Sequence, residues 1–137
     1  MNKVIHEIRK YKELKADIRN IELKLEELEE DIGITEQPQG ERIGQTYKIT
    51  STVETQAIMQ IEKKEALNKA KNNKKRKIAR IENALSVLKE EHREVIQLAH
   101  IELKAYWRVQ EKVHKSYTRV KQLEIEAAQK MEKYILQ

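Results

Sequence analysis

Apolar residues recur every three or four positions along most of this chain, and this spacing predicts helices. In the first 32 residues the apolar positions Leu14, Ile18, Ile21, Leu25 and Leu28 follow steps of 4-3-4-3. A narrow heptad stripe of this kind is typical of a coiled coil, because only a partner helix can cover it. We therefore expect these five residues to mediate oligomerisation, with a dimer as the favoured homo-oligomer.

Helix-breaking residues are confined to one short part of the chain. The 3 glycines and the 1 proline all lie between residues 33 and 44. This placement predicts a loop over residues 33–50, with Gly33 as the cap that ends the first helix. Ser51 and Glu54 then have the spacing of a capping box, which predicts that a second long helix begins there. Two long helices joined by one loop predict an antiparallel helical hairpin.

Shorter apolar stripes follow the hairpin, at residues 78–88, 92–103, 105–113 and 116–135. Ser116 is a candidate N-cap for the last of them. The stripe of this last helix predicts a buried side made of Val120, Leu123, Ala127 and Met131. A short helix, a tight turn and a longer capped helix form the pattern of a helix-turn-helix motif.

The predicted fold class is therefore all-α. We expect a coiled-coil-like oligomerisation region over residues 1–77 and a helix-turn-helix bundle over residues 78–137. No apolar run approaches the roughly 18 to 20 residues that span a bilayer, and the first residues contain no apolar signal region. These features predict a protein without membrane contact, in the cytoplasm.

Charge and composition exclude several classes of function. Lys and Arg number 28 against 23 Asp and Glu, which gives a net charge of +5, and the whole basic excess lies after residue 50. The chain has 0 Cys, its 4 His lack the spacing of a metal site, and no phosphate loop or nucleophile motif is present. We expect no enzyme activity, no cofactor and no metal. The basic run at residues 69–77 fits either a DNA-contacting arm or a solvated helix face.

Two stretches carry a resemblance to a known family. They are LKEEHREVIQL at residues 88–98 and AYWRVQEKVHKSYTRVKQLE at residues 105–124. Together they resemble region 4 of sigma-70-type factors, and more closely the sigma-like phage late-gene regulators of the RinA/ArpU type. The sequence departs from that pattern at Gln110, where a small residue is usual, at His114, where Gly is common, and at Lys115, where an apolar residue is usual.

The resemblance implies a sequence-specific regulator that binds double-stranded DNA in a bacterial host cell and contacts RNA polymerase. The implied recognition helix presents base-reading candidates on the side opposite its buried stripe. These candidates are Tyr117, Thr118, Lys121, Gln122 and Ile125. Four basic residues are candidates for phosphate contacts, namely Lys104, Arg108, Lys115 and Arg119.

Two alternatives remain open at this point. A small terminase subunit of a DNA-packaging system also combines a helix-turn-helix with helical oligomerisation, although it usually has them in the reverse order. A coiled-coil adaptor without DNA binding would need only the helical stripes.

Overall fold

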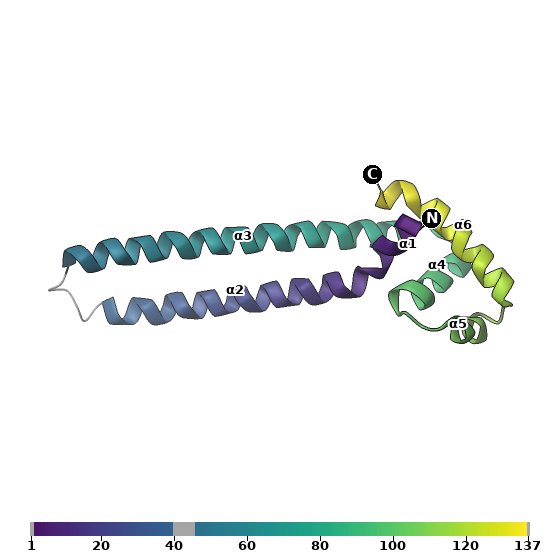
Figure 1. The fold of residues 1–137 in the computed structure, drawn as a ribbon, viewed down its shortest axis with the longest axis horizontal. Coiled ribbons are helices and arrows are strands. Elements are labelled where there is room, and N and C mark those ends of the chain that lie inside the picture. The colour runs from purple at the N-terminus through teal and green to yellow at the C-terminus, as the bar shows by residue number, and fades with distance from the viewer. Residues whose placement is uncertain (1, 40–45, 137) are drawn as a thin grey trace. The chain divides into compact units, whose positions relative to one another are not determined.

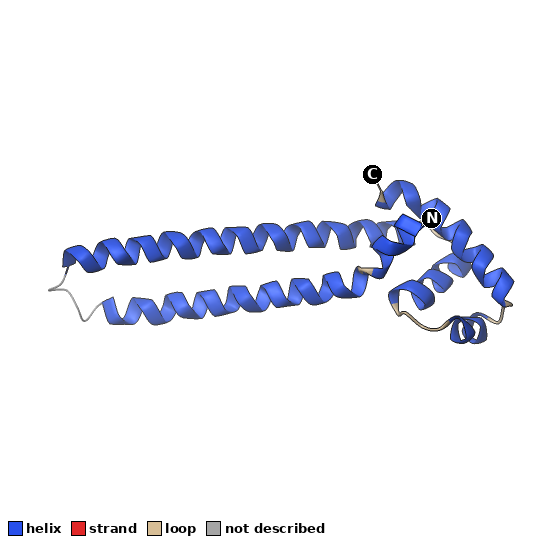
Figure 2. Cartoon of the chain, viewed as in Figure 1, coloured by secondary structure: helices blue, strands red, loops and turns tan. Residues whose placement is uncertain are grey.

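The computed structural model describes the backbone of residues 2–39 and 46–136, and the side chains of residues 3–30 and 53–136. Every regular element in the described backbone is a helix, which confirms the all-α class (Figures 1 and 2). The chain forms two compact units: unit 1 combines residues 1–16 with 75–137, and unit 2 comprises residues 17–74.

The N-terminal segment forms two helices where the apolar stripe predicted one. Helix α1 (Asn2–Arg9) and helix α2 (Tyr11–Gln39) are separated by the single residue Lys10. At the junction the Lys10 amide donates to the Glu7 carbonyl at 3.2 Å. The break falls where the apolar spacing changes phase, between Ile8 and Leu14, so the side chains of the two helices face different neighbours.

The predicted loop over residues 33–50 was wrong at both ends. Helix α2 continues through Gly33 to Gln39, and α3 (Thr46–Ser86) begins five residues before Ser51. Neither the Gly33 cap nor the capping box at Ser51 therefore ends or starts a helix. A single Gly costs a helix only about 1 kcal/mol relative to Ala, so the long favourable segment around Gly33 overrides it. Residues 40–45 of the predicted loop lie outside the described residues.

Unit 2 contains the larger parts of α2 (residues 17–39) and α3 (residues 46–74), which run side by side in opposite directions (Figure 1). Two ion pairs fix their register. The Lys64 ammonium lies 3.2 Å from the Glu29 carboxylate, and the Lys74 ammonium lies 3.1 Å from the Asp17 carboxylate. Both are partly exposed, so they set the alignment of the helices more than the stability of the unit.

Unit 1 is built on four further helical elements. Helix α4 (Glu90–Ile96) runs into the π-helix η1 (Gln97–Ile101), and α5 (Tyr106–Val113) and α6 (Tyr117–Ile135) follow. All four contribute to one apolar cluster, made of Val95, Leu98, Ala99, Val109, Val120 and Leu123. The π-helix was not predicted, since the sequence indicated one continuous helical piece over residues 92–103. The hydrogen bond that the Glu102 amide donates to the Gln97 carbonyl at 2.9 Å joins residues five apart, which is the spacing of a π-helix.

Arg93 joins the end of α3 to α4. Its guanidinium donates to the Leu85 carbonyl at 3.2 Å and to the Leu88 carbonyl at 3.0 Å. These carbonyls lie where α3 ends, where the last carbonyls of a helix lack i+4 partners. The Leu85 carbonyl also accepts the Leu88 amide at 3.2 Å. Arg93 therefore acts as a C-terminal cap for α3, supplied by the next helix.

Helix α1 packs within unit 1. It contacts α6 and η1, and its apolar residues Val4 and Ile8 are fully buried. The predicted domain over residues 78–137 therefore lacks α1, although α1 packs in the same unit. A segment from the other end of the chain cannot be assigned to this core from local spacing alone.

We predict that Ile8→Ala destabilises the protein by about 2–5 kcal/mol, because it removes a fully buried side chain and leaves a cavity. Leu23→Ala on α2 is the matched control, since Leu23 is 40% exposed, and it should cost about 1 kcal/mol or less. Urea unfolding followed by circular dichroism measures both. Equal losses for the two variants would show that α1 does not pack in unit 1.

Candidate nucleic-acid interface

Helices α5 and α6 are joined by a three-residue turn, residues 114–116. His114, which follows the last residue of α5, takes the left-handed conformation with φ 57° and ψ 44°. This conformation costs a non-glycine residue about 1 kcal/mol, although histidine adopts it more often than most. Ser116 caps α6 as predicted, with its hydroxyl accepting the Arg119 amide at 3.2 Å. The turn therefore forms without the glycine that is common at this position.

Helix α6 has one fully buried side. The predicted residues of this side are all buried, namely Val120, Leu123, Ala127 and Met131. Burying four apolar side chains fixes the rotation of α6 about its own axis. The opposite side must then face solvent, whatever its function is.

The exposed side of α6 carries most of the base-reading candidates. Tyr117 is 51% exposed and Ile125 is 40% exposed, and Thr118 and Gln122 are also exposed. All four lie in the first half of the helix, next to the Ser116 cap. Lys121 differs from them because its side chain is only partly exposed and is held by neighbouring groups.

Those neighbours surround a buried carboxylate, Glu124. The Tyr106 hydroxyl donates to its Oε2 at 2.7 Å, and the Lys121 ammonium donates to its Oε1 at 3.2 Å. The His100 Nε2 lies 3.0 Å from Oε2. Glu124 is 2% exposed and His100 is 3% exposed. One carboxylate on α6 thus binds side chains from η1, α5 and α6 itself, and we call these four residues the Glu124 network.

The network keeps Glu124 ionised. Burial alone would raise the pKa of this carboxyl, but the His100, Tyr106 and Lys121 side chains outweigh burial and lower the pKa to about 2. Burial and the bond to Glu124 raise the pKa of the Tyr106 hydroxyl. At neutral pH the carboxylate is therefore charged and the phenol is a neutral donor.

The network also positions the first turn of α6. The Lys121 ammonium lies 3.3 Å from the Tyr106 hydroxyl and 4.6 Å from the centre of its ring. The rings of Tyr106 and Tyr117 meet edge to face, with centroids 5.8 Å apart and an interplanar angle of 77°. The exposed Tyr117 ring therefore packs against Tyr106 of α5.

The four predicted phosphate residues have different surroundings. Lys115 pairs with Glu91 at 3.2 Å, and the Arg119 guanidinium lies 3.8 Å from the Glu126 carboxylate. Lys104 lies 3.6 Å from Glu102. Arg108 is exposed and lies over the Trp107 ring, 5.2 Å from its centre.

Lys112, which was not among the predicted phosphate residues, extends the cationic surface of α5. The neighbouring Lys104 ammonium lowers the pKa of Lys112, and Arg108 adds to the effect. Arg108 and Lys112 are four residues apart within α5 and so lie on one face of the helix. This i, i+4 spacing was visible in the sequence and was the signal that could have identified Lys112.

The basic run at residues 69–77 lies on α3, away from α5 and α6 in the chain. Lys69, Lys75 and Lys77 are exposed, and Lys74 is held by Asp17. Both interpretations of this run, a DNA-contacting arm and a solvated helix face, stay predictions.

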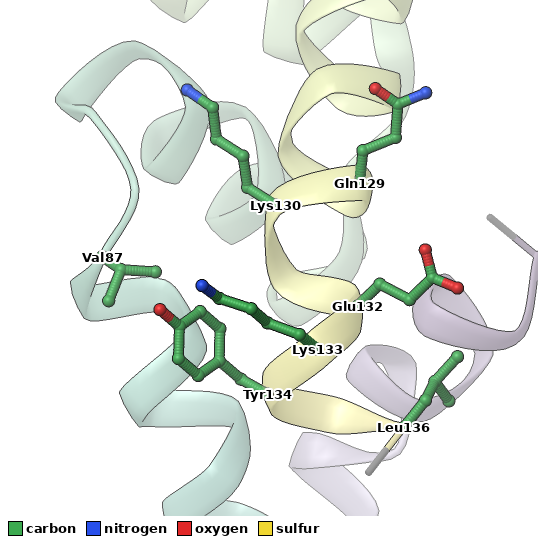
Figure 3. A pocket seen from close by; sticks show the side chains of 7 residues that line it. All are labelled: Val87, Gln129, Lys130, Glu132, Lys133, Tyr134 and Leu136. Atoms are coloured by element: carbon green, nitrogen blue, oxygen red, sulfur yellow. The ribbon is translucent and has the colours of Figure 1, made fainter.

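An open hollow of about 710 Å³ lies at the C-terminal end of α6. Figure 3 shows that Gln129 and Lys130 point away from each other along its wall, while the Tyr134 ring lies toward Val87. These polar groups do not converge on one point, as a specific small-molecule site requires. Among the described residues, no cluster of three or more His, Asp or Glu side chains has an arrangement that could hold a metal ion.

The comparisons with known proteins return nothing: no family model, no curated protein and no solved structure matches this chain. In the described part of the chain, none of the helices has both the length and the apolar character that crossing a membrane requires.

We predict that Glu124→Gln loses stability at neutral pH and that the loss depends on pH. A pKa lowered from 4.5 to about 2 corresponds to about 3 kcal/mol in favour of the ionised, folded form. Because the folded pKa is the lower one, this contribution is complete above about pH 5. It disappears as the pH falls from about 4.5 toward 2.

Urea unfolding at a series of pH values measures the difference in free energy between the wild type and Glu124→Gln. Glu132→Gln, at an exposed position on the same helix, is the control and should change little. A difference for Glu124→Gln that stays constant down to pH 2 would contradict the role of the ionised network.

Proposed function

We propose that this protein is a sequence-specific regulator of transcription that binds double-stranded DNA, with α5 and α6 as its helix-turn-helix. The observation that carries the proposal is the two-sided character of α6. Its buried side is fixed against the core, and its exposed first half carries Tyr117, Thr118, Gln122 and Ile125. A helix of this kind, with its N-terminal residues free, can enter a major groove.

The exposed side chains suit base edges. A glutamine can make two hydrogen bonds to adenine, and Thr118 and Ile125 can contact a thymine methyl group. The Lys121 ammonium can also donate to guanine, but it already donates to Glu124 and Tyr106. The Gln122 amide oxygen accepts one long hydrogen bond, from the Arg119 guanidinium at 3.4 Å, and its side chain is exposed. We therefore assign Gln122 the larger part in base reading and Lys121 the smaller part.

The cations beside α6 suit the phosphate backbone. Lys104, Arg108 and Lys112 form a stripe on and before α5, and Lys115 and Arg119 lie at the turn and the start of α6. Each phosphate that such a residue neutralises releases counterions, so binding should weaken steeply with salt. In the context of the resemblance, we propose that the protein activates late genes of a phage or prophage in a bacterial host and contacts RNA polymerase there.

We predict that Gln122→Ala weakens binding to the preferred duplex about 5- to 100-fold, as expected for one lost bidentate base contact of about 1–3 kcal/mol. Its binding to a scrambled duplex should change little, because that binding depends on phosphates. Fluorescence anisotropy with both duplexes measures the two affinities. Gln129→Ala, an exposed glutamine further along the same helix, is the matched control and should change neither affinity. An equal loss on both duplexes would remove Gln122 from base reading.

We also propose that unit 2 mediates self-association. Among the described side chains of unit 2, Ile21 alone is fully buried, while Ile18, Leu25 and Leu28 are half-buried. Leu14, the fifth residue of the predicted oligomerisation seam, is buried within unit 1. Two helices therefore leave part of the seam uncovered, as expected when a bundle needs more helices.

A second copy of the chain is the partner that fits this surface. An apolar groove of about 490 Å³ between α2 and α3 is lined by Leu28, Ala66 and Leu67, with charged side chains at its edges. The acidic run at residues 26–31 and the basic run that begins at Lys69 lie at different levels of the helix pair. A copy turned end to end places opposite charges at the same level, whereas a copy in the same direction places like charges together.

We predict that the wild type sediments as a dimer and that Leu67→Glu shifts it to a monomer, because a charge in the groove opposes its burial. Leu23→Glu, at a position that is already 40% exposed, should remain a dimer. Analytical ultracentrifugation measures the mass, and circular dichroism checks that both variants stay helical. A wild-type monomer would overturn the proposed self-association, and a larger ring would favour the packaging-subunit alternative.

A further inference from the structure

A second cavity lies next to the Glu124 network, inside unit 1. Its volume is about 390 Å³, and α1, η1, α5 and α6 all contribute to its wall. The residues that line it are Ile5, His6, Arg9, His100, Tyr106, Lys121 and Glu124. Six of these seven side chains carry a polar or charged group, in contrast to the scattered groups of the hollow in Figure 3.

The floor of this cavity is buried and polar. His100 and Glu124 are both more than nine-tenths buried, and the Tyr106 hydroxyl is bonded to Glu124. The His100 Nδ1 is buried and has no hydrogen-bond partner. Buried polar atoms without partners are uncommon and each calls for an explanation, of which a functional role is one. A few polar groups placed in the wall of a cavity can fix the orientation of a ligand.

The rim of the cavity is cationic. Arg9 and His6 are exposed on α1, one turn apart, and Lys121 lies on the side of α6. Within the described part of the chain, the Arg9 guanidinium has no carboxylate partner, whereas Glu124 already receives hydrogen bonds from Tyr106 and Lys121. The anionic group of the cavity is thus already paired, and the exposed Arg9 guanidinium at its edge is accessible to a ligand.

We propose that this cavity binds a small anionic ligand with a phosphate or carboxylate group, and that Arg9 is its main contact. A guanidinium presents paired donors that match such groups in a bidentate geometry. Lys121 and His6 supply further donors around the same opening. The volume suits a small metabolite-sized anion and lies near the lower end of known ligand sites.

Ligand binding would be coupled to DNA binding, and this part of the inference depends on the proposed function. The ligand connects α1 to Lys121, and Lys121 lies between the cavity and the exposed side of α6. A ligand that changes how Lys121 is held changes the affinity for DNA, and DNA changes the affinity for the ligand by the same factor.

The direct test is an NMR titration of the full chain with inorganic phosphate, phenyl phosphate and acetate, at constant ionic strength and without DNA. We expect saturable shifts of the amide signals of Arg9, Tyr106 and Lys121 with at least one of these anions. Arg9→Gln should weaken that binding about tenfold or more, and Arg9→Lys should restore part of it. Arg19→Gln, which changes an exposed guanidinium on α2, is the matched control and should bind as the wild type does.

The outcomes separate the ligand site from the proposed function. Absence of saturable binding for all three anions, or equal binding by Arg9→Gln and the wild type, overturns the site. If Arg9→Gln binds DNA more weakly while no free anion binds, Arg9 contacts a DNA phosphate and the cavity is not a ligand site. Saturable anion binding by a protein that binds no DNA would support the site and contradict the proposed function.

Discussion

The buried carboxylate of Glu124 is the interaction on which the arrangement of unit 1 depends. Burying a lone carboxylate is costly, so this group persists only because a hydroxyl, an ammonium and an imidazole surround it. Each of these partners comes from a defined place: His100 from η1, Tyr106 from α5 and Lys121 from α6 itself. The π-helical register of η1 belongs to the same constraint, because it determines where His100 lies.

The network connects the core to the surface proposed to read DNA. Tyr106 holds both Glu124 and Tyr117, so α5 and the first turn of α6 behave as one piece. Preorganised side chains lose less conformational entropy on binding than free ones. The same network forms the floor of the cavity beside α1, and any ligand there would act on α6 through Lys121.

The sequence predicted those features that depend on neighbouring residues. The Ser116 cap, the buried side of α6 and the ends of α5 and α6 all follow from local spacing and capping, and the structure confirms them. The features that were missed depend on distant residues. Nothing near Val4 and Ile8 indicates that they pack on α6, and Glu124 was indistinguishable from the other carboxylates on helix faces. The loop prediction was wrong because a single Gly at position 33 does not end a long helix whose other residues favour it.

Whether α6 reads DNA sequence is tested most directly by selection of bound fragments from bacterial genomic DNA with the full-length protein. The selection is run at two salt concentrations, because phosphate contacts alone lose affinity steeply with salt while base contacts retain their preference. The account predicts one consensus at both concentrations, enriched further at the higher one. Fragments without a consensus at either concentration, or no bound DNA at low salt, would contradict it.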